Sequence, residues 1–107
     1  MKLERDIVRF TNLVYFTILP AKVLDTLKAE VTPSVKDCEF YTASGSVVTV
    51  TNFIGGAAGQ RLHIRGDGTT TISHNTNIKT NTGANKLLLA NKVYRFTYFE
   101  PTWIEDE

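Results

Sequence analysis

The sequence predicts an α+β domain, in which one or two N-terminal helices pack on a mainly antiparallel β-sandwich or rolled sheet. Apolar residues recur at helical spacing only before residue 32. From residue 39 onward, short runs of β-branched and aromatic residues alternate with turn residues. The 107 residues, 42% of them hydrophobic, are enough for one domain with its own core. We therefore expect a single domain over residues 1–107, helical in 1–31 and β in 32–107.

Two helical patterns occupy the N-terminal part. The apolar residues of the first pattern are Leu3, Ile7, Phe10 and Val14. They predict a helix over residues 4–15, whereas residues 16–19 have a strand-like composition and stay open. The apolar residues of the second pattern are Val23, Leu24, Leu27 and Val31. They predict a helix over residues 21–31, which Pro33 ends because the residue before a proline disfavours helical geometry.

The β part is centred on residues 47–74. Strands are expected at residues 39–42, 46–53, 60–65, 69–74, 86–90, 93–99 and 102–104. The glycine-rich loop around Gly55, Gly56 and Gly59 suits a corner that needs positive φ angles. The turn 66–68 (Gly-Asp-Gly) predicts a hairpin that joins the strands on either side of it.

Alternation along these strands predicts which side chains form the core. The core candidates are Val48, Val50, Leu62, Ile64, Ile72, Ile78, Leu87, Leu89, Val93 and Trp103. Arg61, His63 and Arg65 alternate with Leu62 and Ile64, so they should point to the opposite face.

Aromatic residues near the end of the chain form a candidate interaction surface. Its members are Tyr94, Phe96, Tyr98 and Trp103. Exposed rings of this kind stack on sugars or anchor protein interfaces. The alternative, which we favour, is that most of these rings belong to the core.

Charge and cysteine content exclude several classes of protein. Lys and Arg total 12 against 11 Asp and Glu, without a basic stripe, so we expect no nucleic-acid partner. Charges from Lys2 to Arg9 interrupt the start of the chain, and the apolar run at residues 14–19 is too short to span a bilayer, so we expect no membrane partner. Cys38 is the only cysteine, which excludes an internal disulfide and fits a reducing cytoplasm or a particle assembled there.

Two short motifs have alternative interpretations that the sequence does not favour. The glycine-rich loop lacks the lysine and the following helix of a phosphate-binding loop, so it is better explained as a structural corner. The tripeptide Arg65-Gly66-Asp67 spells a cell-adhesion signal, but it is better explained by the tight turn.

Catalytic and metal-binding patterns are weak. His63 and His74 are the only histidines and have no clustered carboxylates beside them, so we expect no metal site. Ser73, His74 and Asp67 contain the residue types of a catalytic triad, but neighbours on one strand alternate faces. The acidic residues 105–107 are expected to form a solvated tail. The sequence therefore predicts no cofactor and no enzymatic activity.

An ordered series of motifs in the β part resembles a β-domain of bacteriophage tail proteins. The series is T-N-F-x-G-G-x-x-G-Q, an alternating strand, D-G-x-T-T-I-x-H, an asparagine-rich stretch and a terminal aromatic strand ending near W-x-E. The matching residues are Asn52, Phe53, Gly55, Gly56, Gly59, Gln60, Asp67, Gly68, Thr70, Thr71, Ile72, His74, Gly83, Ala84, Asn85, Trp103 and Glu105. The resemblance covers about two thirds of the chain.

This resemblance implies a structural module of tail spikes, tail fibres or receptor-binding proteins, akin to the shoulder domain of siphophage receptor-binding proteins. Its implied partners are further copies of itself, often as a homotrimer, and phage tail proteins. Its implied location is the tail of the virion, or the host cytoplasm during assembly. We therefore predict a non-enzymatic structural or assembly protein. The alternative is a carbohydrate-binding module that recognises host cell-wall polysaccharide.

Overall fold

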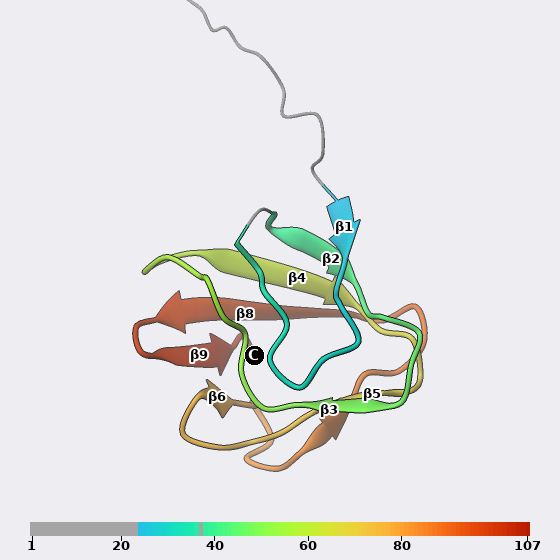
Figure 1. Cartoon of the computed structure of the whole chain (residues 1–107). Coiled ribbons are helices and arrows are strands. Elements are labelled where there is room, and N and C mark those ends of the chain that lie inside the picture. Colours follow the sequence, from blue (N-terminus) through green and yellow to red (C-terminus); the bar gives the residue numbers. More distant parts are fainter. Residues whose placement is uncertain (1–23, 37) are drawn as a thin grey trace, which may run out of the picture.

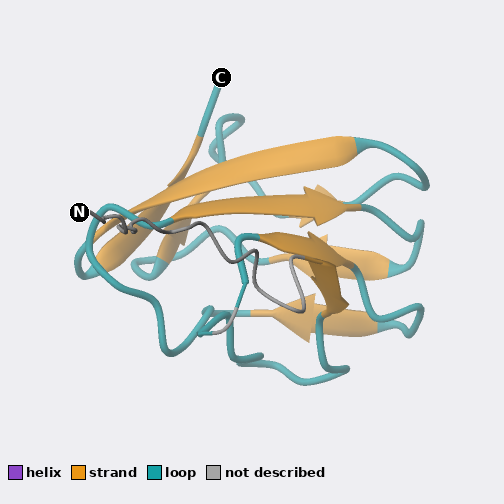
Figure 2. Cartoon of the chain, turned by 90° about the horizontal axis from the view of Figure 1, so that it is seen from above, coloured by secondary structure: helices purple, strands orange, loops and turns teal. Residues whose placement is uncertain are grey.

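The chain is built entirely from β-strands and loops in the part that the structure describes. The computed structural model describes residues 24–36 and 38–107, in which there is no helix (Figure 2). The strands are β1 (Leu24–Thr26), β2 (Phe40–Thr42), β3 (Val48–Val50), β4 (Arg61–Arg65), β5 (Thr70–Ile72), β6 (Ile78–Lys79), β7 (Lys86–Leu87), β8 (Val93–Phe99) and β9 (Thr102–Glu105). These residues accordingly contain no helix capable of crossing a bilayer.

The strands form two sheets that enclose the core between them (Figure 1). The larger sheet has the order β1-β2-β4-β8-β9-β6, and the smaller one has the order β3-β5-β7. Four pairs are parallel, namely β1–β2, β2–β4, β3–β5 and β6–β9. The prediction of a mainly antiparallel structure was therefore wrong. The reason is that the chain passes repeatedly from one sheet to the other, so that strands adjacent in a sheet are often not consecutive in the chain.

Residues 24–36 and 38–107 are all-β, so the predicted α+β class with N-terminal helices is not supported. Leu24, which was expected on a helix face, pairs instead with Phe40 in the parallel β1–β2 ladder. Of the apolar positions 24, 27 and 31, only Leu27 is buried. An amphipathic helix derives most of its stability from packing one apolar face, and this segment packs no such face. Residues 4–15, where the other helix was predicted, lie outside the described residues.

The turn 66–68 is a crossing between the sheets, so the predicted hairpin was also wrong. Strand β4 pairs with β2 and β8, whereas β5 pairs with β3 and β7. The crossing requires glycine at its first position because a Cβ on Gly66 would lie 2.1 Å from the carbonyl oxygen of Leu89. Close approach of two backbone segments, rather than a tight turn, explains this glycine.

Most of the predicted core residues are buried, but two strands have the opposite phase. Those confirmed as buried are Val50, Leu62, Ile64, Ile72, Ile78 and Trp103. Val48 is only half-buried. In the run of three leucines Leu88 is buried, whereas Leu87 and Leu89 are exposed. Val93 is likewise exposed, because β8 directs Tyr94 and Phe96 inward. Three adjacent leucines, and a strand with aromatic residues on both faces, contain no clear alternation that sets the phase.

Candidate functional site

The aromatic residues predicted as an interaction surface pack inside the molecule. Tyr94, Phe96 and Trp103 are buried, and Tyr98 is half-buried. The ring of Tyr98 stacks on Trp103, with 4.6 Å between the ring centroids and 21° between the planes. The edge of Trp103 meets Phe53 at a centroid distance of 5.6 Å. This burial favours the core role over an exposed binding surface.

The glycine-rich corner is shaped by the same tryptophan. A Cβ on Gly56 would lie 2.6 Å from Cζ2 of Trp103, so the backbone here lies directly against the indole. The side chain of Gln60 holds the corner in place: its Nε2 donates to the carbonyl of Val35 at 2.8 Å, and its Oε1 accepts from the amide of Ala57 at 3.0 Å. The loop therefore has a structural partner at each of these points.

The Asp67 carboxylate organises the crossing between the sheets. It accepts hydrogen bonds from the backbone amides of Thr69, Thr70 and Gly45 and from the hydroxyl of Thr70, at 2.7–2.8 Å. Partial burial raises the pKa of Asp67, but these hydrogen bonds to the ionised form outweigh it and hold the pKa well below its ordinary value. Because the Asp67 carboxylate already accepts these hydrogen bonds within the fold, it is not available to a receptor as part of an adhesion tripeptide.

The residues of the weak triad pattern have separate structural partners. Nδ1 of His74 accepts a hydrogen bond from the amide of Thr80 at 3.1 Å, and the hydroxyl of Ser73 accepts one from the side-chain amide of Asn75 at 3.2 Å. His74 is half-buried, and its ring nitrogen is bonded within the fold. Among residues 24–36 and 38–107, no group of three or more His, Cys, Asp or Glu side chains could hold a metal ion.

The acidic tail is not fully solvated, and this prediction needs a correction. Glu105 is only 5% exposed, because alternation along β9 directs it inward together with Trp103. Both of its carboxylate oxygens lie 2.9 Å from Nζ of Lys86, and one of them also accepts from the amide of Asn81 at 2.9 Å. The pair links the end of the chain to β7 across the sandwich edge.

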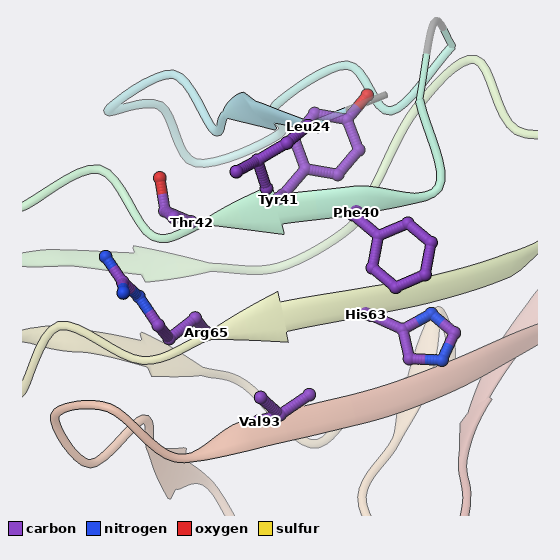
Figure 3. Close-up of a pocket in the computed structure, with 7 residues that line it drawn as sticks. All are labelled: Leu24, Phe40, Tyr41, Thr42, His63, Arg65 and Val93. Carbon is purple, nitrogen blue, oxygen red and sulfur yellow. The ribbon is translucent and has the colours of Figure 1, made fainter. Parts of the chain in front are cut away.

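An open, mainly apolar site lies on the outer face of the larger sheet. A pocket of about 170 Å³ opens there, over β1, β2, β4 and the start of β8 (Figure 3). Its walls are formed by Leu24, Phe40, Tyr41, Thr42, His63, Arg65 and Val93. Most of the pocket wall is apolar, and Figure 3 shows the Arg65 side chain beside it.

Ring stacking shapes one side of the pocket. Phe40 and His63 are directly paired across β2 and β4, and their rings stack with centroids 4.5 Å apart and planes 14° apart. Nδ1 of His63 lies 3.3 Å from a carboxylate oxygen of Glu39. Phe40 is 46% exposed despite its size. Sequence reasoning missed Phe40, although the burial of its neighbour Tyr41 follows from the same period-two alternation.

Basic side chains lie on the same face of the sheet as this pocket, and one of them, Arg65, forms part of its wall. Arg61 and Arg65 are exposed and His63 is half-buried, which confirms the predicted outward orientation of these three residues. Arg95 is exposed on the adjacent strand β8, where it is paired directly with His63. The outer face of the larger sheet thus combines exposed apolar side chains with a basic surface. This combination suits a partner that is apolar and acidic.

The two-layer all-β fold and the structural use of its polar residues define the class of the protein as a β-sandwich module. The family model described as phage depolymerase C-terminal beta sandwich domain matches residues 25–103. The chain belongs to this family, and it is a bacteriophage tail-associated structural domain of the tail-spike or receptor-binding type. The C-terminal β-sandwich of phage depolymerases is a structural, non-catalytic part. No curated protein and no solved structure matches the chain.

Proposed function

We propose that this chain acts without enzymatic activity, by associating with further copies of itself or with other tail proteins. The observation that carries the proposal is the outer face of the larger sheet, where Leu24, Phe40 and Val93 are each about half exposed around one pocket. Contiguous exposed apolar surface on a soluble domain marks an interaction site. The arginines beside it limit the choice of partner to surfaces with complementary charge.

The polar chemistry of the described residues supports a structural role. Ser73, His74 and Asp67 form the catalytic-triad pattern of the sequence, and each is bonded to partners within the fold. Such bonds orient backbone segments and leave no free pair of acid and base at these positions.

The absolute mass in solution, measured by light scattering after size exclusion over a wide concentration range, tests this proposal. We expect an oligomer that dissociates on dilution, and weaker association in the variant Phe40→Ser. Leu87→Ser is the matched control, because Leu87 is 45% exposed on the smaller sheet. A wild-type protein that stays monomeric and binds no purified tail protein would contradict the proposal.

A second candidate function is the recognition of host cell-wall polysaccharide. The specific observation in its favour is one open pocket that has the exposed ring of Phe40 at one end and the guanidinium of Arg65 and the hydroxyl of Thr42 at the other. Aromatic rings pack on sugar rings, and the polar groups at the rim can bind hydroxyls. The test is co-sedimentation with purified wall polysaccharide. Binding that Phe40→Ala removes supports this function, whereas no binding at high protein concentration contradicts it.

A further inference from the structure

The outer face of the larger sheet carries a projecting aromatic side chain as well as a pocket. Phe99, at the end of β8, is 64% exposed. It lies on the same face as Val93, which lines the pocket, because the two residues are six positions apart on one strand. The next residue along the chain, Glu100, is also exposed and carries a carboxylate in the turn that follows β8.

The pocket matches this pair of residues in size and charge. A cavity of about 150 Å³ can hold one benzene ring, and the pocket measures about 170 Å³. Its wall is mostly apolar, with the guanidinium of Arg65 beside it. A single aromatic ring followed by a carboxylate would therefore bury apolar surface and place opposite charges together.

Phe99 cannot occupy the pocket of its own chain. A strand rises about 3.3 Å per residue, so Phe99 and Val93 lie roughly 20 Å apart along β8. We propose that Phe99 of one copy inserts into the Phe40–Arg65 pocket of a second copy, and that Glu100 pairs there with Arg65. This inference rests on the self-association proposed above, and it names the contact that produces it.

The charge distribution favours a head-to-tail arrangement. Arg61 and Arg95 lie on the face between the pocket and Phe99. Complete face-to-face overlap of two copies would bring these like charges together, whereas overlap of the two ends alone would not. A contact between two different ends of the same molecule is heterologous, and it closes into a ring when the rotation between copies allows it.

The experiment compares the sedimentation of the wild type with that of Phe99→Ser, Arg65→Glu and the control Leu87→Ser. Only variants whose melting temperature equals that of the wild type are compared. Truncation of a central aromatic anchor is expected to weaken association by about 30-fold, and charge reversal should act in the same direction. Leu87→Ser should associate as the wild type does. The double variant Arg65→Glu with Glu100→Arg restores opposite charges and should recover part of the association that Arg65→Glu loses.

Mixing two variants provides an independent check. Phe99→Ser keeps its pocket and Arg65→Glu keeps its ring, so the mixture should form complexes that neither variant forms alone. If the Phe99→Ser variant associates as strongly as the wild type, this contact is overturned but self-association stays in place. A wild type that never associates overturns both proposals. Absence of complexes in the mixture, when each single variant is monomeric, also contradicts the contact.

Discussion

The indole Nε1 of Trp103 donates a hydrogen bond of 3.0 Å to the carbonyl oxygen of Phe53, fifty residues earlier in the chain. The donor and acceptor are both buried, and the two rings meet edge to face. This bond joins β9 to the segment that precedes the glycine-rich corner. It connects the first and last of the motifs that characterise the β part.

Replacement of Trp103 by Phe should therefore be costly. The change removes the only donor in the indole, leaves the carbonyl of Phe53 without this partner, and creates a cavity. We expect a loss of about 3 kcal/mol in the free energy of unfolding, measured by denaturant titration. Val47→Ala is the control, because Val47 is exposed and lies outside the proposed contact. Equal stability of the two variants would show that the buried bond contributes little.

Alanine at two glycines should destabilise to different degrees. A Cβ on Gly56 meets the edge of the Trp103 ring, whereas a Cβ on Gly66 meets the backbone carbonyl of Leu89. A ring can shift slightly but packed backbone cannot, so Gly66→Ala should cost more than Gly56→Ala, which should cost about 2 kcal/mol. Thermal and denaturant unfolding of both variants, with the exposed Ala58→Ser as a control, measures this order. The reverse order would contradict the explanation from close approach.

The free energy of unfolding should fall in acid because Asp67 becomes protonated. Its pKa in the folded protein lies below the ordinary value of 3.8, so the ionised form is stabilised by folding. This contribution is complete above about pH 4 and is lost as the pH falls further, because the unfolded chain binds a proton first. Asp67→Asn should be less stable than the wild type near neutral pH by about 2 kcal/mol, with a flatter pH profile below pH 4. Unfolding titrations from pH 2 to pH 7 measure both effects. Parallel profiles of the two proteins would exclude Asp67 as the cause.

The ion pair between Lys86 and Glu105 should show strong non-additivity. Lys86→Met leaves the buried carboxylate without its cation, and we expect a loss of about 3 kcal/mol. Adding Glu105→Gln removes the charge but keeps an acceptor for the amide of Asn81, so the double variant should recover much of this loss. A double-mutant cycle from denaturant unfolding measures the coupling. Additive effects of the two substitutions would show that the charges are well solvated.

Strand positions were predictable where alternation is clear. Residues 61–65 read Arg-Leu-His-Ile-Arg, and the structure buries Leu62 and Ile64 while exposing the arginines. The bounds of β8 agree with the prediction as well. Where alternation fails, as at Leu87, Leu88 and Leu89, the phase was wrong, because the local sequence does not state which leucine meets the opposite sheet.

The sequence did not predict the pocket on the outer face of the larger sheet. The outward orientation of His63 and Arg65 followed from alternation, but their neighbours Leu24 and Phe40 come from strands 23 or more residues earlier in the chain. Of the aromatic residues predicted as an interaction surface, Tyr94, Phe96 and Trp103 are buried and Tyr98 is half-buried. Residue type alone does not distinguish a core ring from a surface ring, because both bury apolar area, one in the fold and the other in a complex.

The sequence by itself determined the short β-strands, much of the core and the family. Tertiary structure alone decided the two-sheet arrangement, the parallel pairing and the crossing at residues 66–68. The physical reason is that side-chain alternation is a local property of one strand, whereas the choice of a neighbour depends on hydrogen bonds and packing between distant segments. Leu24 illustrates this difference, because its helical spacing is local and its place beside Phe40 is not.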